Sequence, residues 1–65
     1  METEIHKPMT QFDAVWIAEG LDESATEEQM IEAWQMLHDT GLAYQLQGWF
    51  GRTAQHLIEQ GVINP

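Results

Sequence analysis

The sequence contains no cysteine, so it offers no disulfide, no thiol nucleophile and no thiolate ligand for a metal. A chain of 65 residues is short, and domains of this size bury only about 60% of the surface that the unfolded chain exposes. Disulfides, metals or oligomerisation commonly supply the missing stability. Because disulfides are excluded here, the apolar side chains must build a compact core or an aromatic patch that closes a homo-oligomer. These side chains include three tryptophans, two phenylalanines, one tyrosine and four methionines.

Positive charge is almost absent from the chain. One lysine and one arginine oppose eleven acidic residues, which gives a net charge of −9. Residues 1–39 hold ten acids and Lys7 and carry the whole imbalance, whereas residues 40–65 hold only Glu59 and Arg52, which cancel. Lysine and arginine supply most of the affinity for nucleic-acid phosphates and for anionic membranes. The composition therefore argues against direct binding to DNA, RNA or a membrane surface.

Long apolar runs and strand patterns are also missing. The polar start of the chain lacks the apolar stretch of a secretory signal, and no segment has the length of an uncharged bilayer span. We therefore expect a cytoplasmic protein. No alternation of apolar and polar residues bounded by turn residues predicts a strand. The sequence predicts an all-α fold, a compact bundle of three to four short helices.

The helix boundaries follow from capping and glycine signals. Thr10 with Asp13, and Thr26 with Gln29, have the spacing of capping boxes. Gly41 is able to end a helix with a positive φ. A helix through both Gly48 and Gly51 would lose about 1 kcal/mol at each, so we expect a break near Gly48. The expected organisation is a flexible N-terminal arm over residues 1–9 and a single helical domain over residues 10–65. Its helical segments lie at about 10–19, 26–39, a short turn at 42–47, and 49–60.

Apolar residues at helical spacing mark one face of each segment. In the first segment, Phe12, Val15 and Trp16 share such a face. The second segment has Met30, Ala33, Trp34 and Leu37, and the last has Phe50, Ala54, Leu57 and Ile58. Val62 and Ile63 are expected to fold back onto the core after Gly61 caps the last helix.

The residues that could carry chemistry do not form a catalytic or metal-binding pattern. None of the histidines at positions 6, 38 and 56 has a histidine partner three or four residues away, the spacing that places two ligands on one helix face. We expect no metal and no cofactor. Acidic pairs are frequent, but acid–base catalysis needs a pocket that shifts a pKa, and a chain this short has little interior for one. We expect that the protein is not an enzyme.

The same acidic residues are candidates for a protein-binding surface, because a charged face steers association with a surface of opposite charge. The predicted acidic face consists of Asp22, Glu23, Glu27, Glu28 and Glu32. Aromatic residues and arginine dominate binding energy at interfaces, so the predicted anchors are Tyr44, Trp49, Phe50 and Arg52. Arg52 also has a structural interpretation, as a tie to a carboxylate such as Asp39 or as a ring-stacking partner of Trp49.

The segment from Asp39 to Ile63 carries a distinctive sequence pattern. It reads Asp39-Thr-Gly-Leu-Ala-Tyr-Gln-Leu-Gln-Gly48, then Gly51-Arg-Thr-Ala54, Leu57-Ile58 and Gly61-Val-Ile63. This pattern resembles a group of small uncharacterised proteins encoded by tailed bacteriophages. The resemblance covers residues 39–63 and implies a phage accessory protein in the cytoplasm of an infected bacterium. Proteins of that kind commonly bind and redirect a host protein.

Two functions from different classes remain open at this point. The first is an accessory protein that binds a host or phage protein partner through that partner's basic surface, which could be its nucleic-acid-binding surface. The second is a homo-oligomeric structural or assembly protein whose aromatic residues meet across a symmetry axis. The oligomeric state in solution separates the two.

Overall fold

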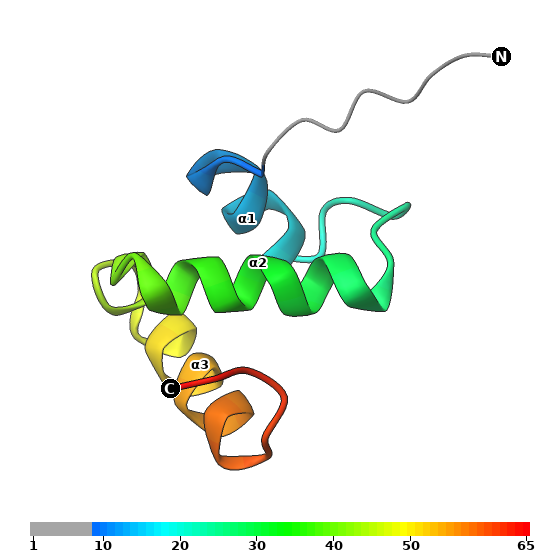
Figure 1. Ribbon diagram of the computed structural model, residues 1–65. Helices are drawn as coiled ribbons and strands as arrows, with labels where there is room; N and C mark the ends of the chain where they lie inside the picture. The colour runs from blue at the N-terminus through cyan, green and yellow to red at the C-terminus, as the bar shows by residue number, and fades with distance from the viewer. Residues whose placement is uncertain (1–8) are drawn as a thin grey trace, which may run out of the picture.

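The structure, a computed structural model, describes residues 9–65. The arm expected over residues 1–9 lies outside the described residues except for Met9. The described chain forms three α-helices and one short 3-10 helix, without a strand, which confirms the all-α fold. The helices are α1 (Gln11–Ala18), α2 (Glu27–Asp39), η1 (Leu42–Tyr44) and α3 (Gly48–Glu59) (Figure 1).

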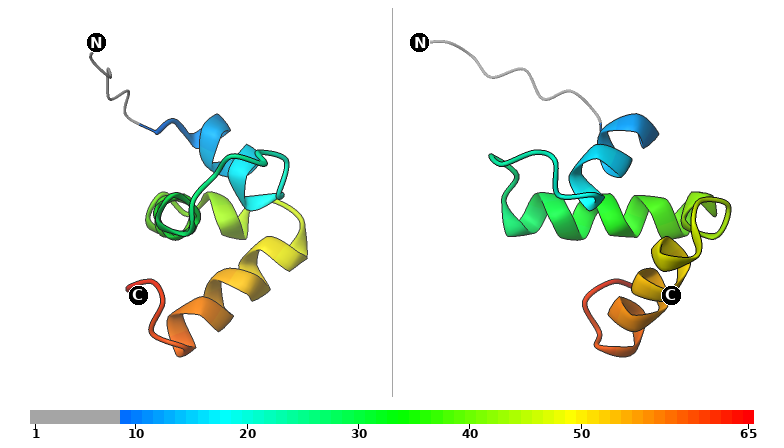
Figure 2. Two further views of the ribbon diagram at one scale, coloured as in Figure 1. Left: turned by 90° about the vertical axis from the view of Figure 1, so that its right-hand side faces the viewer. Right: turned by 180° about the vertical axis from the view of Figure 1, so that it is seen from behind.

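The longest helix, α2, lies in the middle of the fold. In Figure 1, α1 packs on one side of α2 and α3 on the other, and Figure 2 shows the same arrangement from two further directions. η1 turns the chain at the end of α2 and contacts both α2 and α3. The core is made of nine buried side chains from every element and the C-terminal tail: Ala14, Ile17, Ala33, Trp34, Leu37, Ala43, Phe50, Ala54 and Ile63.

Both predicted capping boxes are present. The Thr10 hydroxyl accepts a bond from the Asp13 N–H at 3.1 Å, and the Asp13 carboxylate accepts one from the Thr10 N–H at 3.1 Å. Thr26 and Gln29 repeat the arrangement at the start of α2, at 3.1 and 2.9 Å. Gly41 has φ of 80°, so its lack of a Cβ permits the turn into η1. These local signals explain why the helix starts were predictable.

The face of α1 that turns toward the core differs from the expectation. Ala14 and Ile17 are buried against α2, whereas Phe12 and Trp16 point into solvent with 74% and 46% of their surface exposed. The predicted apolar face of this helix is therefore wrong as a core face, with only Val15 partly buried. The physical reason is the close approach of α1 to α2, which favours small contact residues, and Ala14 and Ala33 are both fully buried.

The break expected near Gly48 falls just before it, so α3 begins at Gly48 and carries Gly51 inside the helix. Gly51 has a packing role that offsets its low helix propensity. A Cβ at this position would lie 3.2 Å from Cδ1 of Tyr44, which is tighter than ordinary contact. The missing side chain thus lets the Tyr44 ring rest against α3.

A double-mutant cycle tests this packing role. Gly51→Ala alone should stabilise the protein by clearly less than the roughly 1 kcal/mol that alanine gains over glycine in a helix, because the new methyl group displaces the Tyr44 ring. In a Tyr44→Ala background, the same substitution should recover that full gain. Urea unfolding followed by circular dichroism measures all four proteins. Equal effects of Gly51→Ala in both backgrounds would contradict the assigned contact.

The C-terminal tail returns to α2 and completes the core. Ile63 is buried at 3% exposure, as predicted, whereas Val62 is 38% exposed. The Gln35 side chain holds the tail through two bonds to the Asn64 backbone, donating to its carbonyl at 2.9 Å and accepting from its N–H at 2.7 Å. These contacts connect residues 29 positions apart in the sequence and attach the tail to α2.

Candidate protein-binding surface

The exposed face of α2 carries a row of carboxylates. Glu28, Glu32 and Asp39, called the acidic row below, recur at helical spacing on the side away from the buried residues of α2, and all three are exposed. None of them forms an ion pair within residues 9–65, although the Gln35 amide donates a bond to Asp39 at 3.1 Å. Two half-buried apolar side chains, Ile31 and Met36, lie between these acids along a shallow depression.

The other predicted acidic residues do not share this face. Glu27 lies at the opposite edge of α2, where it borders a groove with Trp34 and Leu57. Asp22 and Glu23 lie in the connection between α1 and α2, and Asp22 accepts bonds from the backbone N–H and hydroxyl of Ser24 at 3.0 and 2.7 Å. The predicted five-residue acidic face is thus split among three places. Of the predicted residues, only Glu28 and Glu32 share the exposed face of α2. Helical spacing could also have placed Asp39 on this face, because it lies seven residues after Glu32.

Phe50 was predicted as one of the interface anchors if exposed, and the structure places it in the core. Its side chain is 2% exposed and packs against Trp34, with ring centroids 5.9 Å apart, and against Trp49 at 4.0 Å. Trp49 is 37% exposed, but its ring also contacts Trp34 edge-on at 6.2 Å. These three rings form one aromatic cluster between α2 and α3, so their first role is to pack these two helices together.

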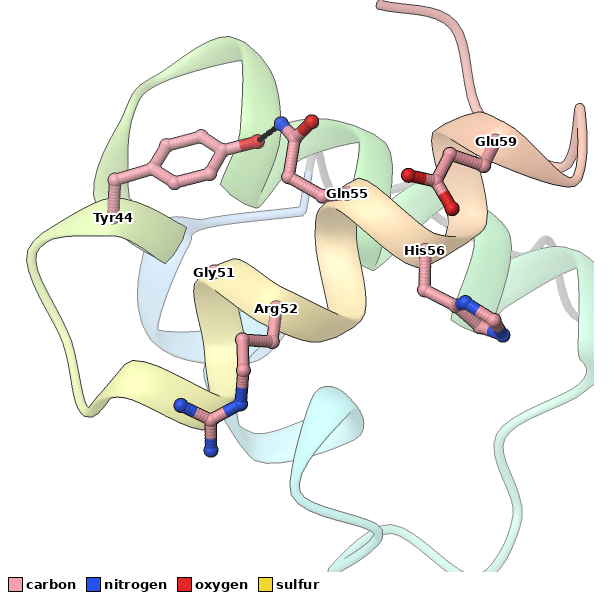
Figure 3. Close-up of a pocket in the computed structure, with 6 residues that line it drawn as sticks. All are labelled: Tyr44, Gly51, Arg52, Gln55, His56 and Glu59. Carbon is pink, nitrogen blue, oxygen red and sulfur yellow. Dashed lines mark hydrogen bonds between the residues drawn. The ribbon is translucent and has the colours of Figure 1, made fainter.

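Tyr44 is 45% exposed and anchors a small polar network. Its hydroxyl lies 2.7 Å from Nδ1 of His38 and accepts a bond from the Gln55 amide at 2.8 Å. Figure 3 shows the ring extending from η1 toward Gln55 of α3. The network ties the end of α2 to the middle of α3 through η1, which gives this tyrosine a structural function.

Arg52 forms neither of the structural contacts that the sequence suggested. Its side chain has no ion pair, side-chain hydrogen bond or ring contact within residues 9–65. It is exposed, and its Nη1 lies 3.0 Å from where a Cβ on Gly48 would be. In Figure 3 it points away from His56 and Glu59 on the same helix face. The prediction of a tie to Asp39 or Trp49 is therefore wrong, and Arg52 remains available at the surface.

Phe12 and Trp16 are exposed aromatic residues that the sequence did not single out as candidate anchors. They lie one helical turn apart on the outer face of α1, and their rings stack with centroids 6.4 Å apart and planes 26° apart. Leu21, which follows α1, is 50% exposed. The spacing of the two rings was visible in the sequence, but the side of α1 that faces α2 was not.

Two further observations concern the described residues only. Across residues 9–65, no helix has both the length and the hydropathy needed to cross a bilayer. In the same span, no three side chains of histidine, aspartate or glutamate come together in a way that could hold a metal ion.

Comparison with known proteins gives one match. A protein-family model described as a domain of unknown function (DUF7417) matches residues 16–65, which is more than half of the chain. The matched span contains α2, η1 and α3 and begins at Trp16, inside α1. Neither the curated proteins nor the solved structures contain a significant match.

Proposed function

We propose that this chain, which belongs to the DUF7417 family, acts by binding a protein partner that presents a basic surface to the acidic row of α2. The single observation that carries the proposal is that none of the three carboxylates of the acidic row forms an ion pair within residues 9–65. Residues 14–39 contain seven of the eleven acids, since Glu19, Asp22, Glu23 and Glu27 join the acidic row, and they contain no lysine or arginine.

The arrangement also has an energetic consequence. Like charges four residues apart on a helix, such as Glu28 and Glu32, destabilise it by a few tenths of a kcal/mol. A partner that places lysine or arginine side chains beside these carboxylates removes the repulsion and gains attraction. The half-buried Ile31 and Met36 beside the row supply apolar surface that a partner would cover at the same time.

The carboxylates of the acidic row are spaced too widely to imitate the phosphates of nucleic acid closely, but they suit a partner protein with a basic surface. Asp39 lies eleven positions after Glu28, which corresponds to about 16 Å along a helix. Three charges over that length are sparser than one strand of DNA, which carries a phosphate about every 3.4 Å along the axis. The row thus supports charge steering toward a basic surface, with apolar contacts alongside.

The resemblance of residues 39–63 to tailed-phage proteins supports a proposal for where in the cell this binding takes place. We propose that the partner is a host or phage protein in the cytoplasm of an infected bacterium, and that the chain is an accessory protein that redirects its partner. The buried apolar residues and the glycine turn of that segment hold α3 against α2. The segment therefore packs against the side of α2 opposite the acidic row.

The test is an affinity pull-down from bacterial lysate with the full chain as bait, followed by affinity measurement on the purified captured protein. Neutralising the row with Glu28→Gln, Glu32→Gln and Asp39→Asn should weaken binding about tenfold, because exposed charge pairs contribute roughly 0.5 kcal/mol each. The measurement is isothermal titration calorimetry with the wild type and the variant.

A matched control separates the row from net charge. Glu19→Gln, Glu27→Gln and Glu59→Gln remove the same number of charges from exposed positions outside the row, and binding should stay close to that of the wild type. Equal loss in both triple variants would show that the total charge matters and the acidic row does not. Unchanged binding in the row variant would refute the proposed function.

A further inference from the structure

The outer face of α1 is an uncovered aromatic surface. Phe12 is the most exposed of the large apolar side chains in residues 9–65, and Trp16 stacks on it from the next turn of the helix. Ala14 and Ile17 hold α1 to α2 from the opposite side, so this orientation is fixed by the core. Phe12 and Trp16 keep 74% and 46% of their surface exposed to water.

A shallow depression lies beside Trp16, and its lining combines apolar groups with carboxylates. It is formed by Met9, Asp13, Trp16, Ile17, Asp22 and Gln29. Asp22 is held in place by Ser24, because both bonds from the serine converge on Oδ1. The Asp22 carboxylate, which accepts both of these bonds, therefore lines the same depression as the Trp16 ring.

This combination selects a particular ligand chemistry. An aromatic face attracts a cationic side chain, and a neighbouring carboxylate pairs with the same cation. Arginine satisfies both because its planar guanidinium stacks on rings and binds carboxylates with two parallel hydrogen bonds. Apolar residues next to the cation would cover Phe12 and Leu21.

We infer that the outer face of α1 docks a segment of a partner protein in which arginine or lysine stands beside apolar residues. The inference rests on the proposed function, since it names a second contact with a basic protein partner and supplies the apolar anchors that such an interface needs. The argument for the occupant is charge complementarity, as residues 14–39 hold seven acids and no lysine or arginine.

A second copy of this chain fits the surface poorly. A two-fold symmetric contact brings the same patch of each copy together, so Asp22 and Glu19 of one copy would approach those of the other. Like charges placed opposite each other at an interface disfavour the pairing. A basic partner meets the same apolar surface without that repulsion.

The experiment uses the full chain, isotope-labelled, and follows amide and tryptophan indole NMR signals during peptide titration. The probe is a synthetic amphipathic peptide with leucines on one helix face and arginines along both borders. Its control replaces each arginine with glutamate. The arginine peptide should cause saturable shifts in the Trp16 indole signal and in the amides of residues 11–22, and the glutamate peptide should cause none.

Variants connect the shifts to the side chains. Trp16→Ala should weaken peptide binding about 30-fold, the effect of losing a central aromatic anchor. Asp22→Asn keeps the oxygen that accepts from Ser24 but removes the charge, and it should weaken binding about fivefold. Val62→Ala is the control, because Val62 is an exposed apolar residue on a different element, the C-terminal tail, at 38% exposure. It should leave the affinity unchanged. Circular dichroism verifies that each variant is folded.

The outcomes separate this inference from the proposed function. Shifts confined to the acidic row of α2 would overturn the α1 site while the proposed function stands, whereas no saturable shift from the arginine peptide would overturn both. Equal binding of the glutamate peptide would overturn the charge argument. Concentration-dependent shifts of the amides of residues 11–22 without peptide, abolished by Trp16→Ala, would assign the α1 face to a second copy and overturn the inference.

Discussion

Phe50→Ala should destabilise the protein by about 3–5 kcal/mol, the range for removing a buried phenylalanine side chain. Phe50 is 2% exposed and is one of the two largest fully buried side chains in residues 9–65. Its removal opens a cavity and also breaks the ring contacts with Trp34 and Trp49. A chain of 65 residues has a total stability of only about 3–10 kcal/mol, so this variant should be largely unfolded or close to it.

Phe12→Ala is the matched control, since it deletes the same atoms from a residue that is 74% exposed. It should change the free energy of unfolding by less than about 0.5 kcal/mol, because only the stacking contact with Trp16 is lost. Urea unfolding followed by circular dichroism and tryptophan fluorescence measures both variants. Similar destabilisation by the two substitutions would mean that the assignment of core and surface rings is wrong.

Ile63→Ala should destabilise the protein by about 2–5 kcal/mol, as expected for a large-to-small substitution in a core. Ile63 is the only residue of the C-terminal tail that enters the core in the described structure, at 3% exposure. Without this anchor, the two bonds between Gln35 and the Asn64 backbone must hold the tail at an exposed site. We expect the tail to detach from α2 before the rest of the fold is lost.

Val62→Ala provides the comparison for the tail, because Val62 is the preceding residue and is 38% exposed. Its effect should be below about 1 kcal/mol. Thermal unfolding gives the stabilities, and hydrogen exchange at the amides of residues 61–65 reports whether the tail remains docked. A small effect of Ile63→Ala with unchanged exchange at the tail would contradict its place in the core.

The parts of the fold that depend on local signals were predictable from the sequence. Thr10 and Thr26 start their helices through bonds to residues three positions on, and Gly41 permits the turn that follows α2. These effects involve neighbours in the chain, so residue spacing contains them. The role of Gly51 was not predictable in this way, because it depends on where the Tyr44 ring lies after η1 has turned the chain.

The candidate binding surface was predictable only in part, for a related reason. The sequence identified Glu28 and Glu32 as members of one face, since their spacing on a helix fixes their relative directions. It did not show that α1 turns Ala14 toward α2 and leaves Phe12 and Trp16 in solvent, because that choice depends on packing between two helices. Helical spacing defines a face, and only the neighbouring helix decides whether the face is buried.

The most direct test of the central claim is the affinity of the purified partner as a function of ionic strength. Raising the ionic strength from about 0.01 M to about 0.15 M shortens the screening length from roughly 30 to 8 Å. We expect the affinity of the wild-type chain to fall steeply over this range, and that of the variant with a neutralised acidic row to fall less. An affinity that stays constant with ionic strength would contradict the account, because recognition would then not depend on the uncompensated carboxylates of α2.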